Sequence, residues 1–389
     1  MQAQPSHVSG VLAATSKSCG RWPLIGLLAL AIFVGSSAAN WAGMVTTVSE
    51  QREGSIQLQP SVVRVGSEAV PWAHIMFVAN DAPNRTSVLP HAVRLKNGEV
   101  WTGKITAISR TSVTLESATL GTKPFAIEQL SAIDFAPRLG DLGSEKSRSL
   151  HRLSGKPLSG TILWLKGDRL AIDTPIGAIE LKASGLKRYV CDKDPAAAPL
   201  VLDEIRLTDG SVLRGSIEPA QDAMVVQHPL FGKHTFGPQA WSSVRRFSGP
   251  AVYLSDLQPV KEKMVPLIRR PADRPRSEFA QSKKTGPASR LVISPKTVLE
   301  YKVPGTIGEK YLLTAGAQLS VGSRGSARLG IRIGEEVLLD KVLTPAENKP
   351  FAFSYEVPVG SSLEITVDFH DRVHFPCSVS IDNALLLKK

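Results

Sequence analysis

The segment RLKNGEVWTGKI, residues 94 to 105, organises the first part of the chain because variants of it return twice. RLSGKPLSGTI occupies residues 152 to 162, and RLTDGSVLRGSI occupies residues 206 to 217. In each copy two glycines stand five positions apart, and an isoleucine follows the second glycine by two positions. The glycine pairs are Gly98 and Gly103, Gly155 and Gly160, and Gly210 and Gly215. A period of about 56 residues indicates an array of similar small units.

Three residues of the first copy, Gly98, Gly103 and Lys104, also match part of a phosphate-binding loop. Such a loop needs Ser or Thr after the lysine to hold magnesium, and a helix that opens at that point. Ile105 follows the lysine instead, and RTSVTLES, residues 110 to 117, alternates polar and apolar side chains as a strand does. We therefore interpret the glycines as turn residues and expect no nucleotide.

Each repeat is expected to form about five short strands that close into a small barrel. The pairs Asn97-Gly98 and Asp209-Gly210 predict two-residue type I′ turns. The last part of each repeat supplies core candidates, namely Phe125, Ile127, Leu130, Ile133, Phe135, Trp241, Val244 and Phe247. Units of this size bury little apolar surface alone, so we expect neighbouring units to pack together.

We expect an all-β chain of tandem small β-barrel-like repeats followed by a C-terminal jelly-roll β-sandwich. The predicted divisions are a signal peptide or anchor (1–40), a degenerate first repeat (45–92), three repeats (93–140, 150–195, 203–249) and a sandwich (250–389) with a basic loop (261–290). The sandwich stands on periodicity, since Leu329, Ile331 and Ile333 alternate with polar residues, as do Leu363, Ile365 and Val367.

The repeats, over residues 50 to 247, resemble Sm-like or SH3-like small barrels of the exported proteins typical of planctomycete genomes. The C-terminal 140 residues resemble the NPCBM family of carbohydrate-binding jelly rolls, through AVYLSDLQPV (251–260) and ASRLVISPKTVLEYKVPG (288–305). This resemblance implies a saccharide or glycan partner. The family commonly has a tryptophan in its closing phrase, where this chain has IDNALLL with Asn383.

Flat aromatic rings are the usual platforms for sugars, and none of the six tryptophans lies beyond Trp241. The other aromatic residues of the C-terminal part are Tyr253, Tyr301, Tyr311, Phe351, Phe353, Tyr355, Phe369 and Phe375. Most stand at strand spacing, so we interpret them as core residues and leave the ligand-binding residues unassigned.

VDFHDRVHF, residues 367 to 375, offers ligand-type chemistry. Asp368, His370, Asp371 and His374 suggest either a metal site or the polar face of a strand that ends in a turn; we favour the second and assign no metal or cofactor. Cys191 and Cys377 form one disulfide or remain two buried thiols, and the sequence leaves both open.

The formal net charge of +11 is concentrated in residues 261 to 290, which hold nine Lys or Arg against three Asp or Glu. One interpretation is a basic loop that touches anionic envelope polymers, and the other is a solvated linker. We favour the linker and expect no nucleic-acid partner.

The N-terminus has the pattern of a secretory signal. Lys17 and Arg21 precede PLIGLLALAIFVG, residues 23 to 35, and the small residues SSAA follow. We favour cleavage over an uncleaved membrane anchor. The remainder is then exported to the periplasm, the cell envelope or the medium.

No G-x-S-x-G, HExxH, recognisable carboxylate pair or complete phosphate loop occurs in the sequence. We therefore expect a non-catalytic exported binding or adaptor protein with a carbohydrate-binding module. The alternative is a structural cell-envelope protein whose repeats make protein–protein contacts. A hydrolase with an unrecognised site ranks third.

The signal interpretation predicts that the mature chain in its host begins near Asn40 and fractionates outside the cytoplasm. N-terminal sequencing of the purified native protein measures this. A soluble cytoplasmic protein that retains Met1 contradicts the prediction.

Overall fold

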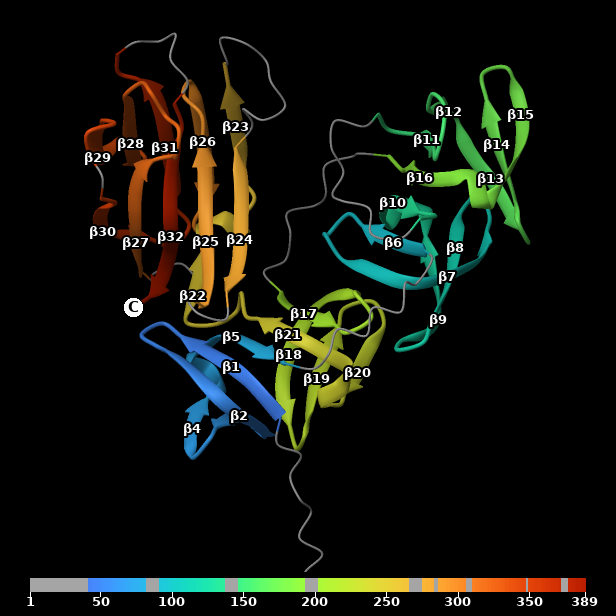
Figure 1. Cartoon of the computed structure of the whole chain (residues 1–389), viewed down its shortest axis with the longest axis horizontal. Coiled ribbons are helices and arrows are strands. Elements are labelled where there is room, and N and C mark those ends of the chain that lie inside the picture. Colours follow the sequence, from blue (N-terminus) through green and yellow to red (C-terminus); the bar gives the residue numbers. More distant parts are fainter. Residues whose placement is uncertain are drawn as a thin grey trace, which may run out of the picture. The chain divides into compact units, whose positions relative to one another are not determined.

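The computed structural model describes residues 41–81, 91–136, 146–192, 202–265, 275–282, 286–305, 310–347, 349–371 and 377–389. The predicted signal segment lies outside them. The described chain is all-β, as expected, and its strand pairs are antiparallel (Figure 1). Its helices are three-residue 3-10 turns, and none in this part is long and apolar enough to cross a membrane.

The first 21 strands fall into four units, I to IV, each with a 3-10 turn before its last strand. Unit I has β1 (Trp41–Thr47), β2 (Gln51–Gln59), β3 (Val62–Val65), β4 (Glu68–Pro71), η1 (Trp72–His74) and β5 (Ile75–Asn80). Unit II has β6 (His91–Leu95), β7 (Val100–Ile108), β8 (Ser112–Ser117), β9 (Gly121–Ala126), η2 (Ile127–Gln129) and β10 (Leu130–Asp134).

Unit III has β11 (Ser149–Arg152), β12 (Leu158–Ser159), β13 (Thr161–Lys166), β14 (Arg169–Thr174), β15 (Gly177–Lys182), η3 (Ala183–Gly185) and β16 (Leu186–Val190). Unit IV has β17 (Asp203–Leu207), β18 (Val212–Ala220), β19 (Ala223–His228), β20 (Gly232–Phe236), η4 (Pro238–Ala240) and β21 (Trp241–Arg245). In every unit the last strand pairs with the first.

Apolar residues at alternating positions fill the interior of these units, and one core cluster draws on all four. Of the predicted core residues, six are buried: Phe125, Leu130, Ile133, Phe135, Trp241 and Val244. Ile127 and Phe247 are only partly buried. Val113 and Leu115 are buried on β8, which confirms that RTSVTLES alternates as a strand.

The expected type I′ turns are wrong. Gly98 and Gly210 have φ of +88° and +93°, but neither Asn97 nor Asp209 has positive φ. The N–H of Gly98 donates to the carbonyl of Leu95, whose own N–H donates to the carbonyl of residue 99. This is a three-residue loop in which only the final glycine is left-handed, so the glycine alone carries the conformational requirement.

The second glycine of each repeat serves close packing. Its φ is not positive, and a Cβ would lie only 2.4, 2.2 and 2.5 Å from a carbonyl oxygen of β8, β14 and β19 at Gly103, Gly160 and Gly215 respectively. A side chain there would push the neighbouring strand away. The repeated motif thus marks where the second strand crosses its neighbour at the closest approach.

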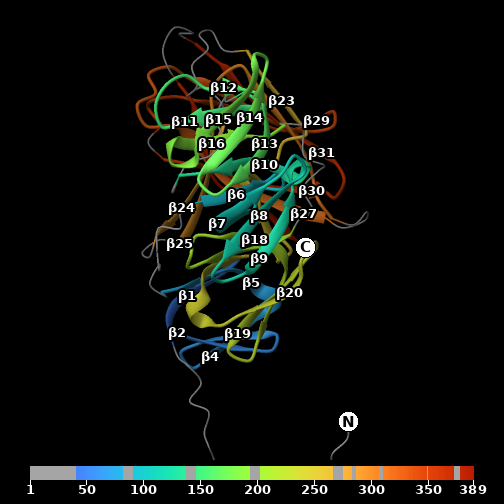
Figure 2. The same cartoon turned by 90° about the vertical axis from the view of Figure 1, so that its right-hand side faces the viewer.

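The units join edge to edge in the order I, IV, II, III, which differs from their order in the chain. Strand β5 pairs with β21, β18 meets β7 at Val212 and Val100, and β10 pairs with β16. Figure 1 shows β5 beside β21, and Figure 2 shows the strands of unit II beside those of unit III. Units do pack, but the sequence neighbours I and II are separated by unit IV.

The remaining strands form a two-sheet sandwich. One sheet contains β22 (Ala251–Tyr253), β24 (Arg276–Ser282), β25 (Gly286–Ile293), β27 (Lys310–Leu319), β30 (Phe351–Pro358) and β32 (Val379–Lys388), and η5 (Leu254–Asp256) follows β22. The other has the order β23 (Lys261–Met264), β26 (Thr297–Lys302), β31 (Ser362–Phe369), β28 (Ala327–Ile333), β29 (Glu336–Leu343). Their inner faces share one core.

The basic stretch 261–290 is not a loop throughout, so that expectation is corrected. Strand β23 pairs with β26 and β24 pairs with β25, each at the edge of its sheet. Edge strands tolerate lysine and proline because one side of the backbone faces solvent, which explains why composition alone suggested a linker. Strand β22 pairs with residues 385–387 of β32, so it belongs to the sandwich sheet.

A buried ion pair lies where unit IV leads into the sandwich. Nη2 of Arg245 is 2.5 Å from Oδ1 of Asp256, and their side chains are 13% and 8% exposed. The Arg245 guanidinium also lies over the rings of Phe247 and Tyr253. Burial raises the pKa of Asp256 to about 7, since desolvation outweighs the attraction of Arg245.

A raised carboxyl pKa means that the folded state binds a proton more tightly than the unfolded state. Asp256 therefore stabilises the fold fully below its unfolded pKa, and this contribution declines as pH rises from about 4 to about 7. We predict that the difference in unfolding free energy between wild type and Asp256→Asn falls across this window and is flat above it. Urea titrations at several pH values measure it.

The matched control is Asp340→Asn, because hydrogen bonding from Arg328 lowers the pKa of Asp340. Its contribution has the opposite sign and varies only below pH about 4. A difference for Asp256→Asn that is independent of pH contradicts the prediction.

For the repeat glycines, we predict that Gly215→Ala destabilises the protein by about 1 to 3 kcal/mol, because a Cβ there meets a carbonyl oxygen. Gly237→Ala in the same unit is the control, since a Cβ at that position would have no atom within 4 Å and its φ is −65°. It should change stability by less than about 0.5 kcal/mol. Equal effects in denaturant titrations would show that crowding is not the cause.

Candidate binding sites

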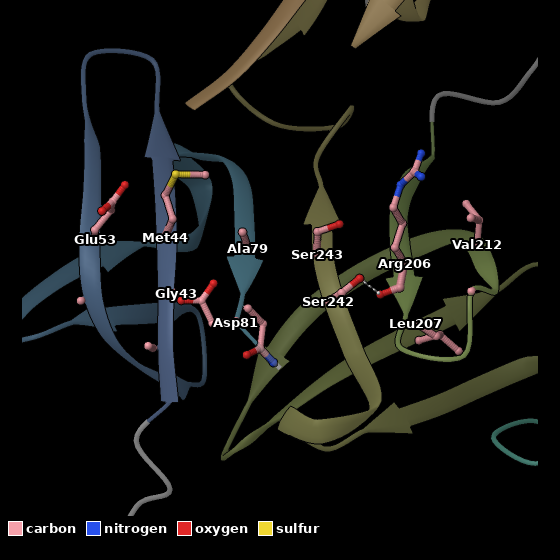
Figure 3. Close-up of a pocket in the computed structure, with 14 residues that line it drawn as sticks. Gly43, Met44, Glu53, Ala79, Asp81, Arg206, Leu207, Val212, Ser242 and Ser243 are labelled. Carbon is pink, nitrogen blue, oxygen red and sulfur yellow. Dashed lines mark hydrogen bonds between the residues drawn. The ribbon is translucent and has the colours of Figure 1, made fainter. Parts of the chain in front are cut away.

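A groove of about 660 Å³ lies on the sheet that joins units I and IV (Figure 3). Six adjacent strands each contribute one residue of a row in register across its floor: Glu53, Met44, Ala79, Ser243, Arg206 and Val212. The floor of the groove is low at the middle of the row because the side chains of Ala79 and Ser243 are small. Figure 3 shows Glu53 and Arg206 at opposite sides of it.

The polar groups of this groove are engaged within the protein. Nδ2 of Asn80 donates to the carbonyls of Pro238 and Trp241, and the Ser242 hydroxyl donates to the Arg206 carbonyl. The Arg206 side chain is paired with Glu204 at 3.0 Å. The Asn80 contacts hold unit I against unit IV, and the other two lie within unit IV, so we assign the groove a structural role and no ligand.

A second concave surface, the trough, lies on the outer face of the β23-β26-β31-β28-β29 sheet and has a volume of about 520 Å³. Its central row is in register across all five strands: Lys263, Val298, Thr366, Gly330 and Asp340. The three middle residues are small, and a Cβ on Gly330 would lie 2.4 Å from the Thr366 hydroxyl. The floor is therefore low along its length.

Charged pairs stand along one side of the trough. Arg328 donates to both oxygens of Asp340 at 2.6 and 2.5 Å, and Lys296 lies 2.9 Å from Asp368. The hydrogen bonds between Arg328 and Asp340 lower the pKa of Asp340 and raise that of Arg328. Both pairs are exposed and hold fixed donors and acceptors beside the floor.

Three other charged residues of the trough form no ion pair with another described residue. Lys263, Arg332 and Glu364 make no ion pair or side-chain hydrogen bond within the described part of the chain. Lys263 belongs to the edge strand β23, whereas Arg332 and Glu364 are opposite each other on β28 and β31. The charge of Arg332 nevertheless helps to lower the pKa of Asp340.

The VDFHDRVHF residues are not gathered into a cluster. Asp368 pairs with Lys296 in the trough, and Oδ1 of Asp371 accepts the N–H of Ser326. His370 is exposed, and His374 lies outside the described residues. Over the ranges described, no group of three or more His, Cys, Asp or Glu side chains is placed to hold a metal.

The aromatic residues of the sandwich mostly serve its core. Tyr253, Tyr301, Tyr311 and Phe353 are buried, and Phe351, Tyr355 and Phe369 are partly buried. The rings at 351, 353 and 355 stack in succession along β30 and pack against the core. Phe375 lies outside the described residues. None of the residues lining the trough is aromatic, so the trough presents hydrogen-bonding groups and charges and no stacking ring.

Cys191 and Cys377 are free thiols, so the disulfide alternative is wrong. Cys191 is buried in the core of the units, and Cys377 packs against the sandwich core. Burial raises the pKa of Cys191 to about 12 and that of Cys377 to about 11, which keeps both protonated and unreactive near neutral pH.

Lys104 lies on β7 opposite Glu116, within a strand rather than at a helix N-terminus. The trough itself was missed by sequence reasoning. The residues that line it occupy the polar positions that alternate with the core residues of β28 and β31, and this alternation is visible in the sequence. Which of those positions line up across five strands depends on the register, which single-strand periodicity does not contain.

No family model matches the chain, and no curated protein matches it. Similar solved structures include CBM51 from Clostridium perfringens GH95 in complex with methyl-galactose, at 14% identity and a TM-score of 0.27, covering 35% of this chain and 99% of that one. Another is the CBM22-1-CBM22-2 tandem domain from Paenibacillus barcinonensis Xyn10C, at 8% identity and a TM-score of 0.21, covering 77% and 94%.

A third is SGBP-B from a xyloglucan utilization locus in Bacteroides uniformis, at 7% identity and a TM-score of 0.21, covering 90% of this chain and 99% of that one. The similar structures thus include carbohydrate-binding modules. At these TM-scores the similarity does not identify a ligand for this chain.

Proposed function

We propose that this is an exported, non-catalytic binding protein whose sandwich binds a polysaccharide along the trough. The observation that carries the proposal is the central row from Lys263 to Asp340, a low floor that crosses five strands beside fixed charged pairs. An elongated ligand fits such a surface better than a compact one does.

The chemistry of the trough suits hydroxyl groups. Each sugar hydroxyl both donates and accepts, and the Arg328–Asp340 pair presents N–H donors and carboxylate acceptors side by side. Because the two groups fix each other, little side-chain entropy is lost when a ligand binds. Hydrogen bonds to charged groups are also about twice as strong as neutral ones.

A binding role fits the carboxylates better than a catalytic one does. Asp340 and Asp368 are both paired with cations. The lowered pKa of Asp340 keeps it ionised near neutral pH, whereas a glycosidase acid needs a raised pKa. Export remains part of the proposal and rests on the N-terminal sequence.

The experiment is a binding screen of the protein against a panel of soluble polysaccharides by affinity electrophoresis. The double variant Arg328→Ala/Asp340→Ala should bind at least about tenfold more weakly, since hydrogen bonds to charged groups contribute about 1.5 to 3 kcal/mol. Stability should change little because the pair is exposed.

Arg148→Ala/Asp192→Ala is the matched control. That pair is also bidentate, and its side chains are similarly exposed, at 62% and 42% against 58% and 45% for Arg328 and Asp340. It belongs to unit III and should leave binding unchanged. Equal losses in the two double variants, or no binding of any polysaccharide by the wild type, would reject the proposal.

A further inference from the structure

Over the described residues, the trough runs from one edge of its sheet to the other. Strands β23 and β29 are the outermost strands of their sheet, and each contributes an end of the central row, Lys263 and Asp340. Five strands spaced about 4.8 Å apart give the row a length of about 19 Å. A bound chain can therefore continue past either edge, which suits an internal stretch of a linear polymer rather than a terminal sugar.

Only some of the charged side chains in the trough form ion pairs with one another. Four cationic and three acidic side chains line it. Arg328 and Lys296 are neutralised by Asp340 and Asp368. This leaves two cations, Lys263 and Arg332, with Glu364 as the one acidic residue not yet paired among those described.

The two uncommitted cations are well separated. Lys263 is on β23, and Arg332 is on β28, three strands away and one row of outward-facing residues to the side. Three strand intervals correspond to about 14 Å. Two cations so placed contact different sugars of one chain and leave the floor between them free for the neutral part of the polymer.

We propose that the trough takes an internal stretch of a linear acidic polysaccharide, a polymer of uronic acids, with Lys263 and Arg332 each paired to a ligand carboxylate. This inference rests on the proposed function and specifies its ligand class. Arg332 has the planar fork that matches a carboxylate, and Lys263 supplies a point charge on the solvent-facing edge. Glu364, opposite Arg332 on β31, is placed to accept hydrogen bonds from hydroxyl groups of the ligand.

The test compares polymers that share a backbone. Polygalacturonate and its methyl ester share a backbone and differ at the carboxyl group, which is charged in one and a neutral ester in the other; alginate and its ester form a second matched pair. We expect the wild-type protein to bind the acidic forms at least about tenfold more tightly than the esters, and less tightly as salt is added. Long oligogalacturonides should compete for binding, and single galacturonic acid units should not.

The variant is Lys263→Gln/Arg332→Gln, which should reduce affinity for the acidic polymer to that of its ester. The control is Lys187→Gln/Lys233→Gln, which removes the same charge from exposed strand positions of units III and IV. The control should bind like the wild type. Equal losses in both variants would indicate attraction by net charge alone and overturn the inference.

Dextran sulfate separates carboxylate recognition from general polyanion binding, and it should bind more weakly than polygalacturonate. If the esters bind as tightly as the acids, or if only neutral polymers bind, the acidic ligand class is wrong while polysaccharide binding stands. If no polymer binds, the proposed function fails together with this inference.

Discussion

The arrangement of the four units depends on one buried carboxylate, that of Glu99. Its side chain is fully buried and accepts hydrogen bonds from the ring N–H of Trp101, Nδ2 of Asn97, Nε2 of His228 and the backbone N–H of Arg214, at 2.9 to 3.2 Å. Nδ1 of His228 accepts two backbone N–H groups, so the ring proton lies on Nε2 and points at the carboxylate. Two of these donors belong to unit IV. Because the units are ordered I, IV, II, III, this is the middle link, and an unpaired charge here would cost about 3 to 5 kcal/mol.

The contact around Glu99 is nearly two-fold symmetric, which explains why repeats of one pattern assemble out of chain order. The N–H of Thr102 donates to the Ser211 hydroxyl, and the N–H of Arg214, at the equivalent position of unit IV, donates to Glu99. The pairs I with IV and II with III also join through equivalent last strands. The array ends where the pattern changes: Pro157 in unit III has no N–H at the position where Val100 and Val212 meet, so it cannot extend the sheet.

The sequence predicted what depends on local pattern. The spacing of Gly103, Gly160 and Gly215 identified the repeat, and alternation identified strands such as β8. It did not predict the order of the units, because the contact of units II and IV brings Glu99 to His228 across 129 residues. The trough was missed for the same reason. Gly330 and Thr366 are ordinary in sequence and form a floor only when β28 and β31 pair in one register.

The basic stretch 261–290 includes the edge strand β23, which contributes Lys263 to the trough. Lysines on an exposed edge strand prevent edge-to-edge association, and that alone accounts for a charged β23. Edge protection requires only charge, of either sign and in any pairing state. The two lysines nevertheless differ: Lys261 lies 3.9 Å from Glu300, whereas Lys263 lines the trough without an acidic partner in the described chain. A residue that served the edge alone would gain from the same neutralisation. Edge protection thus accounts for the charge of β23 but assigns no partner to Lys263, and the proposed acidic ligand would supply one.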